Sequence, residues 1–132
     1  MFVLGERSLE RLQGTHPSLI AVVQRAIQIT PVDFTVIEGL RTPAEETENV
    51  ADGASTTMHS RHLPNTNGLG CAVDLAAWVN NTVAYTPLGL YDQIAAAMKQ
   101  AALDLVVPIE WGGDWASFKD YGHFQLPWKQ YP

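Results

Sequence analysis

The apolar run Ala72–Val79 contains a single aspartate, and this combination constrains the fold more than any other feature. Eight residues rich in Ala, Val and Leu are typical of a strand buried in a sheet. Asp74 lies inside this run, and an unpaired carboxylate in apolar surroundings is costly. Basic residues are scarce nearby, with Arg61 in the flanking segment. The fold must therefore give Asp74 a positive partner, and a metal ion is one solution.

Helix signals occur before and after this run. Ser8 is a candidate N-cap for a short helix over 9–13, and His16-Pro17 begins a second helix that ends at Thr30-Pro31. Thr42-Pro43-Ala44-Glu45 forms a capping box, which predicts a third helix to about Ala51. An apolar stripe predicts a long helix, and it consists of Leu90, Ile94, Met98, Ala101 and Leu105.

Three further short strands are predicted, over 32–37, 106–110 and 123–126. Strands and helices show no regular alternation along the chain. This order favours the α+β class. The length of 132 residues and the lack of a linker or repeat predict one domain over 1–132.

Composition excludes several functions. The formal charge of −6 and the scarcity of Lys and Arg argue against nucleic-acid binding. A single cysteine, Cys71, rules out an intrachain disulfide and a cysteine-rich zinc site. The sequence shows neither a signal peptide nor an apolar stretch long enough for a membrane anchor. We therefore expect synthesis in the cytoplasm of the producing cell.

Candidate metal ligands flank the buried strand. Zinc accepts imidazole nitrogen and carboxylate oxygen, and catalytic zinc sites use three protein ligands with one position open. His62 and Asp74 offer two ligands, and His123 near the C-terminus offers a third. Asp120 stands three residues before His123, where it could act as a general base. Spacing alone leaves ordinary hydrogen-bonded loop residues as an open alternative.

At this point the segments resemble the M15 zinc peptidases, and most closely the phage and prophage L-alanyl-D-glutamate endopeptidases. The similarity runs through "TPVDFTVIEGLRTPAE", "SRHL", "GCAVDLAAWV", "IEWGGDW" and "KDYGHFQLP". Its most specific part is the pairing of S-x-H and G-x-A-V-D with D-x-x-H. The resemblance implies a hedgehog/D,D-peptidase-like fold, in which helices pack on a small antiparallel sheet.

Residue by residue, the resemblance implies a zinc site and its catalytic groups. His62, Asp74 and His123 match the zinc ligands, and Asp120 matches the catalytic carboxylate. Two further matches concern the substrate. Arg41 corresponds to the arginine that steadies the substrate carbonyl, although it could instead simply pair with Glu38. Ser60 corresponds to a serine placed to touch substrate.

Two positions depart from the family pattern. Residues 63–69 lengthen the segment between His62 and the G-x-A-V-D motif, and their Pro, Asn and Gly content predicts a surface loop beside the site. Gly122 stands where the family usually has proline, which predicts a less rigid turn between Asp120 and His123.

Other residues have simpler interpretations. We expect His16 to be structural, His59 to be a solvated loop residue and Cys71 to be a small core residue. Trp111 and Trp115 could line a substrate groove or pack under a loop. Glu110 is the next candidate should Asp120 not be the base.

The resemblance implies a zinc endopeptidase that hydrolyses peptidoglycan stem peptides, with L-Ala–D-Glu as the expected bond. We expect a monomeric phage or prophage endolysin that reaches the cell wall after the membrane is permeabilised and binds peptidoglycan through its catalytic groove. One alternative is a D,D- or L,D-carboxypeptidase acting on stem-peptide ends. Another is a non-catalytic, zinc-stabilised wall-binding module.

Overall fold

The computed structural model describes residues 1–42 and 60–132. Its sheet has the strand order β1-β2-β5-β4, with β3 also paired to β2, and these strands all pair in the antiparallel sense. The strands are β1 (Phe34–Glu38), β2 (Ala72–Val79), β3 (Thr82–Ala84), β4 (Glu110–Trp111) and β5 (His123–Gln125). The predicted α+β class with a small antiparallel sheet is confirmed.

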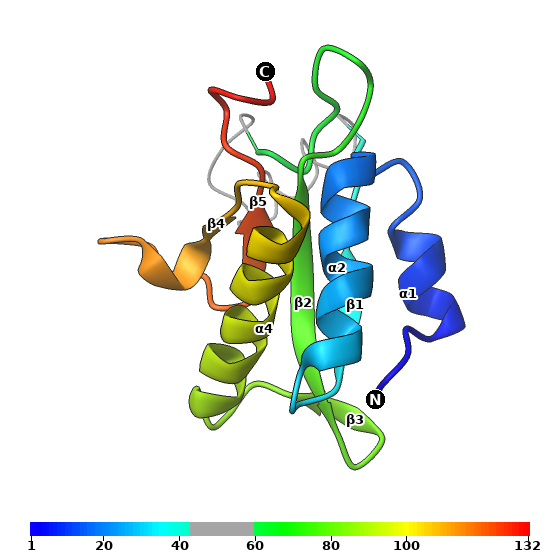
Figure 1. Ribbon diagram of the computed structural model, residues 1–132, viewed down its shortest axis with the longest axis vertical. Helices are drawn as coiled ribbons and strands as arrows, with labels where there is room; N and C mark the ends of the chain where they lie inside the picture. The colour runs from blue at the N-terminus through cyan, green and yellow to red at the C-terminus, as the bar shows by residue number, and fades with distance from the viewer. Residues whose placement is uncertain (43–59) are drawn as a thin grey trace.

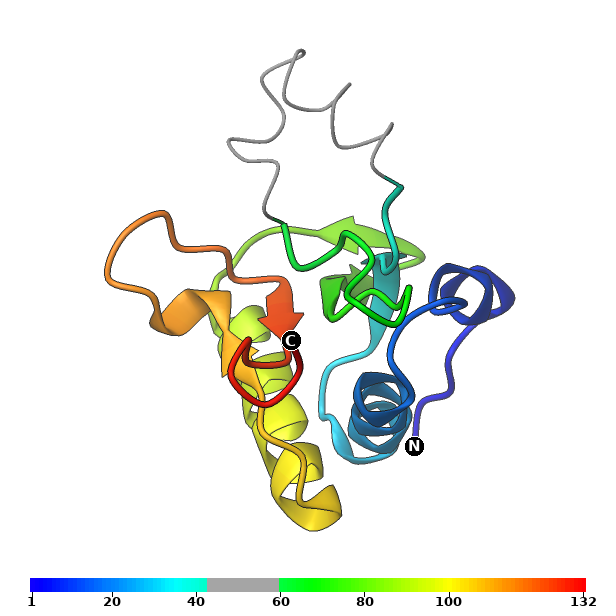
Figure 2. The same ribbon diagram turned by 90° about the horizontal axis from the view of Figure 1, so that it is seen from above.

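Two helices pack side by side on one face of the sheet: α2 (Pro17–Ile29) and α4 (Gly89–Leu105) (Figures 1 and 2). The short helix α1 (Glu6–Arg11) lies beside β1 instead (Figure 1). A 3₁₀ turn, η1 (Gly112–Asp114), follows β4. The predicted third helix at 42–51 and His59 lie outside the described residues, apart from Thr42.

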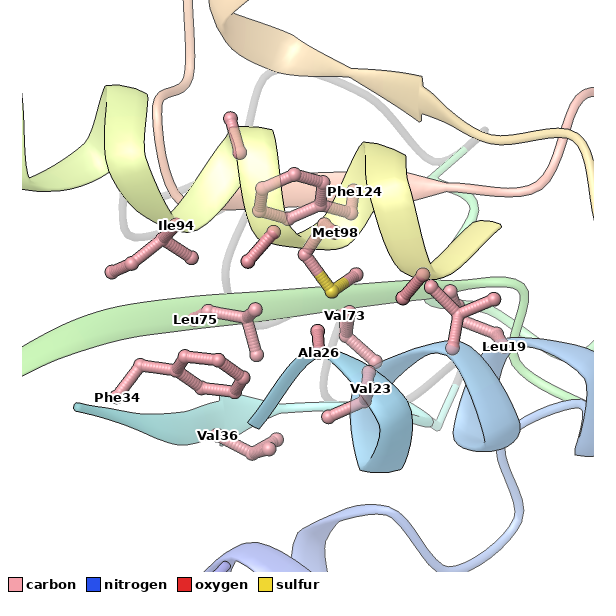
Figure 3. Packing of buried hydrophobic residues seen from close by; sticks show 14 of the residues in the cluster. Leu19, Val23, Ala26, Phe34, Val36, Val73, Leu75, Ile94, Met98 and Phe124 are labelled. Atoms are coloured by element: carbon pink, nitrogen blue, oxygen red, sulfur yellow. The ribbon is translucent and has the colours of Figure 1, made fainter. Parts of the chain in front are cut away.

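The core forms between the sheet and the helices α2 and α4. Alternate residues of β2 point toward the helices, and Val73 and Leu75 contact the same apolar cluster as Val23 and Met98 (Figure 3). Because successive side chains of a strand point to opposite faces, Asp74 points away from this core. Asp74, the one charged residue of the apolar run, therefore lies on the face of the sheet that α2 and α4 leave uncovered.

Helix α2 begins and ends as its sequence predicts. His16 is its N-cap, and the His16 Nδ1 atom accepts a hydrogen bond from the backbone N–H of Ser18 at 3.1 Å. Pro17 follows in the first turn, where its missing N–H costs nothing. The structural role expected for His16 is confirmed.

The cap predicted for α1 is wrong. This helix begins at Glu6 after Gly5, so that Ser8 lies inside it and is buried. The Ser8 hydroxyl accepts a hydrogen bond from the backbone N–H of Val36 at 3.0 Å and also bonds the Thr35 hydroxyl. The Ser8 hydroxyl therefore bonds to strand β1, whereas the local sequence predicted that it would cap the helix.

The strand predicted at 106–110 is also largely wrong, since only Glu110 belongs to a strand. Val106 has a left-handed backbone (φ 56°) and ends α4. The N–H of Val107 donates to the carbonyl of Ala102, which closes the helix terminus. The β-branched side chains suggested a strand, but the termination of α4 determines the backbone here.

Strand β3 was not predicted. Asn80 and Asn81 both have positive φ angles and join β2 to β3 by a two-residue turn, with Val79 paired to Thr82. Asparagine tolerates this conformation and is favoured in such hairpins. The Asn80-Asn81 pair was therefore the feature of the sequence that could have predicted this hairpin.

Candidate metal centre

Three side chains that are far apart in the sequence converge on the uncovered face of the sheet. One ligand atom from each of His62, Asp74 and His123 lies within 4.8 Å of the other two. Asp74 and His123 are cross-strand partners on β2 and β5, whereas His62 comes from the turn that precedes β2. The structure thus brings together all three residues predicted as metal ligands.

The two ring nitrogens of His62 have different surroundings. Nδ1 lies 2.8 Å from the carbonyl oxygen of Gly39, which can only accept, so Nδ1 carries the proton in this bond. Nε2 is buried and, among the described residues, takes part in no hydrogen bond, although it is 3.2 Å from Asp74 Oδ2. Because the proton is on Nδ1 and Nε2 makes no hydrogen bond, the Nε2 lone pair is available for a metal ion.

His123 also has one nitrogen directed toward Asp74. Nδ1 lies 3.1 Å from Asp74 Oδ1, and Nε2 lies 2.8 Å from the side-chain oxygen of Gln125. The amide nitrogen of Gln125 in turn donates to the Glu110 carboxylate at 3.3 Å. Glu110, the reserve candidate for a general base, is therefore bonded to Gln125.

The electrostatics of the cluster favour a charged Asp74. Burial opposes ionisation, but the hydrogen bond from His123 and the proximity of the His62 imidazole outweigh it and hold the Asp74 pKa well below its usual range. Burial likewise opposes protonation of His123, yet the hydrogen bond and negative charge of Asp74 raise the His123 pKa. A carboxylate that stays ionised beside two imidazoles presents negative charge where a cation would bind.

These residues fit a divalent metal such as zinc. Two imidazole nitrogens and a carboxylate oxygen match the donor set of catalytic zinc sites. The Nε2 atom of His62 is buried and makes no hydrogen bond in the described structure, as expected for a nitrogen atom that binds a metal ion. The second nitrogen of each histidine is held by an oxygen acceptor, as is usual for histidines that bind metal.

Asp120 lies close enough to interact with this cluster. Desolvation of its carboxyl group raises the Asp120 pKa, and the negative charge of Asp74 raises it further. Both residues line a cavity of about 320 Å³, together with Ile37, Tyr85, Leu88 and Lys119 among others. A carboxylate with a raised pKa beside a cavity of this size is suited to move protons for a bound substrate.

Gly122 shapes the turn between Asp120 and His123. Its backbone N–H bonds the Asp120 carboxyl group, a contact that proline could not make. A Cβ atom at Gly122 would lie 2.4 Å from the carbonyl oxygen of Leu75. Glycine therefore lets this turn approach β2 closely, which is a reason for the departure from the family pattern that sequence did not reveal.

Arg41 is buried and pairs with Glu38. Its guanidinium donates to both carboxylate oxygens of Glu38, and its backbone N–H donates to the carbonyl of His62 at 2.7 Å. Glu38 is in turn opposite Asp74 in the sheet register. The pairing with Glu38 considered from sequence is thus present, and contact of Arg41 with a substrate remains a prediction.

Ser60 has a local bond to the turn that presents His62. Its hydroxyl accepts a hydrogen bond from the backbone N–H of His62 at 3.1 Å, and its carbonyl accepts from Leu63. Ser60 therefore helps to hold the His62 turn, and its contact with substrate also remains a prediction.

Trp111 and Trp115 differ in their surroundings. Trp111 is buried, stacks on Phe124 and donates its indole N–H to the carbonyl of Tyr121. Trp115 lies with its ring centroid 5.2 Å from that of His123. Trp111 is thus a core residue, and Trp115 is the tryptophan that borders the candidate site.

The inserted segment 63–69 forms a surface loop, as predicted. The Asn65 side chain accepts from the N–H groups of Asn67 and Leu69, and the Thr66 hydroxyl donates to the C-terminal residue Pro132. The described lining of the cavity beside Asp120 includes no residue of this loop. Cys71, which follows the loop, is fully buried as expected.

Sequence reasoning missed Gly39 and Gln125, which hold the outer nitrogens of the two histidines. For Gln125 a signal existed, because residues two apart on a strand share a face, and Gln125 follows His123 by two. For Gly39 no local signal existed, because its carbonyl meets His62 only through the tertiary fold.

Comparison with known proteins identifies the family of the chain. A family profile of phage L-alanyl-D-glutamate peptidases matches residues 1–125. The L-alanyl-D-glutamate peptidase of Escherichia phage T5 is 31% identical over 123 residues, covering 91% of this chain and 86% of that protein. The enzyme of the same name from Listeria phage A118 is 34% identical over 76% of this chain, which spans only 32% of that longer protein.

Solved structures extend the comparison to the fold. The L-Ala D-Glu endopeptidase ChiX of Serratia marcescens superposes with a TM-score of 0.87 at 40% identity, covering 98% of this chain and 94% of ChiX. The vancomycin-resistance D,D-dipeptidase VanXYg has a TM-score of 0.50 at 16% identity over 85% of this chain and 50% of its own, and shows the shared fold alone. The chain therefore belongs to the family of phage L-alanyl-D-glutamate peptidases, with a D,D-peptidase-like fold.

Proposed function

We propose that this protein is a zinc-dependent endopeptidase that cleaves the L-Ala–D-Glu bond of peptidoglycan stem peptides. The observation that carries the proposal is the convergence of His62, Asp74 and His123, with Asp120 beside them at a cavity. The names of its relatives supply the bond: two are L-alanyl-D-glutamate peptidases and ChiX is an L-Ala D-Glu endopeptidase.

In this proposal the metal would be held by His62 Nε2, a carboxylate oxygen of Asp74 and His123 Nδ1. A bound zinc ion would supply Lewis-acid chemistry, which lowers the pKa of a water molecule and polarises the scissile carbonyl. The Asp120 carboxylate accepts a proton from the attacking water and passes it to the nitrogen of the leaving amine. Burial and the negative charge of Asp74 raise the Asp120 pKa, which makes its carboxylate a better proton acceptor for the first of these steps.

Two further residues are assigned supporting roles. Arg41, oriented by its two bonds to Glu38, stabilises the carbonyl oxygen as it gains negative charge. Ser60 contacts the substrate at the edge of the site while its hydroxyl holds the His62 turn.

We also propose that residues 1–132 act as one catalytic domain, as a monomer and as a phage or prophage endolysin. Its substrate lies in the cell wall, which such an enzyme reaches once the membrane has been permeabilised. Among the described helices, none combines the length and apolar character needed to cross a membrane.

Digestion of purified sacculi tests the bond that is cleaved. Mass spectrometry should find new amino termini at D-Glu and new carboxyl termini at L-Ala, with no such products from a His62→Ala variant. Release of free D-Ala instead would indicate a carboxypeptidase. Binding to sacculi without new termini would indicate a wall-binding module, and either result would overturn the proposal.

A further inference from the structure

A chain of three side chains leads from the candidate metal centre to the edge of the sheet. His123 Nε2 lies 2.8 Å from Gln125 Oε1, and Gln125 Nε2 lies 3.3 Å from a carboxylate oxygen of Glu110. His123 and Gln125 are both buried, whereas Glu110 is exposed. The strand register builds this chain, because His123 and Gln125 share a face of β5 and Glu110 is the cross-strand partner of Gln125.

The polarity of the chain follows from the chemistry of its members. The Glu110 carboxylate can only accept, so it binds the amide NH₂ of Gln125 and turns the amide oxygen toward His123. That oxygen also can only accept, so His123 Nε2 must carry a proton. The reverse amide orientation would place the Gln125 oxygen against the Glu110 carboxylate, where both groups are acceptors.

We propose that Gln125, oriented by Glu110, is a positioning residue that keeps the proton of His123 on Nε2 and reserves Nδ1 for the metal. This inference rests on the proposed metal site. A neutral imidazole has two tautomers, and only the one with its proton on Nε2 offers the Nδ1 lone pair to a metal ion beside Asp74. Outer partners that orient a ligand histidine typically change metal affinity by about 10–100-fold when they are removed.

Replacement of Gln125 by leucine tests the inference. Gln125→Leu keeps a similar volume and removes the acceptor, so zinc affinity measured by competition with a chelator should fall by about 10–100-fold. Gln100→Leu is the matched control, because Gln100 makes the same amide-to-carboxylate bond with Asp104 on the exposed face of α4. The control should keep the parental zinc affinity.

Two further variants keep the test decisive if Gln125→Leu folds poorly. Glu110→Ala changes an exposed residue, and it should weaken zinc binding less than Gln125→Leu because the acceptor remains while its orientation is lost. The double variant Glu110→Gln with Gln125→Glu rebuilds the chain with its groups exchanged, since a carboxylate then accepts from His123 and an amide donates to that carboxylate. It should bind zinc within a few-fold of the parent.

A second readout separates positioning from strand stability. In the zinc-loaded protein, nitrogen NMR should find the Nε2 proton of His123 protected from exchange with solvent in the parent and exchanging faster in Gln125→Leu, which lacks the acceptor. Thermal unfolding under the same conditions reports any loss of fold. Parental zinc affinity and parental exchange of the His123 Nε2 proton in a folded Gln125→Leu variant would overturn the inference, whereas a parent that binds no zinc would overturn the proposed function itself.

Discussion

Asp74 and His123 are direct cross-strand partners on β2 and β5, and their side chains meet with His123 Nδ1 3.1 Å from Asp74 Oδ1. The sheet itself thus fixes two of the three candidate ligands, and His62 is the one that a turn supplies. Sites built on strands hold their geometry better than sites on loops. Asp120 is not one of these three residues, so its substitution should change the proton transfer without removing the metal.

Asp120→Asn should leave the metal site intact and remove the proton acceptor. The substitution is nearly isosteric, so fold and zinc content should match the parent while cleavage of sacculi falls by about 10²–10⁴-fold. Zinc content by atomic emission and the rate of product release measure the two effects. Full activity in this variant would show that another residue is the general base.

Removal of the metal should lower both activity and stability. Any ligand that binds only the folded protein stabilises it, so a chelator should abolish cleavage and lower the thermal midpoint of the parent. His62→Ala removes one ligand, and its thermal midpoint should not respond to the chelator. Cleavage of peptidoglycan by fully chelated parent protein would contradict the metal mechanism.

Gly122→Ala should destabilise the fold even though it adds only a methyl group. The new Cβ would lie 2.4 Å from the carbonyl oxygen of Leu75, so β2 or the turn must shift, at a cost of about 1–3 kcal/mol in the free energy of unfolding. Gly89→Ala is the control, because an added Cβ there meets no atom within 4 Å and alanine favours the helix. Urea unfolding measures both variants, and equal stability would refute the close approach.

Asn65→Ala should loosen the inserted loop without affecting the metal. The Asn65 side-chain oxygen accepts hydrogen bonds at 2.9 Å and 3.0 Å from Asn67 and Leu69, and their loss should cost about 1 kcal/mol of stability. Zinc content should stay at the parental level. Loss of zinc from a folded variant would show that the loop helps to build the metal site.

Cys71 should be unreactive in the folded protein. Burial raises the pKa of its thiol above the ordinary value of 9.0, although the charge of Arg61 partly opposes this. A thiol reagent should therefore modify Cys71 far faster in urea than in buffer.

The same shift gives a pH dependence of stability. The Cys71 thiol has a higher pKa in the folded protein than in the unfolded chain. Its contribution to stability is therefore complete below the pKa of the unfolded chain, and it is lost as pH rises from that pKa through the folded one. The free energy of unfolding should thus decline above about pH 9, and Cys71→Ala should decline less. An equal decline in both proteins would exclude Cys71 as the source.

Local signals in the sequence were sufficient for several elements. The cap and proline that begin α2 act within one helical turn, and the bounds of β2 follow from its uninterrupted apolar run. The three candidate ligands that the fold brings together were also predicted, because their motifs keep recognisable spacing whatever lies between them. Each of these features depends on residues close together in the chain or on a motif shared with a family.

Tertiary structure decided the features that depend on partners distant in the chain. The Ser8 hydroxyl bonds to β1 instead of capping its own helix, and Val106 ends α4 instead of beginning a strand. The register of β4 and β5 places Glu110 against Gln125, and the close approach of two backbones requires Gly122. The sequence by itself thus determined which groups could bind a metal. The tertiary structure decided which atom each candidate ligand presents, because the hydrogen-bond partners and steric limits there come from segments that only the folded chain brings together.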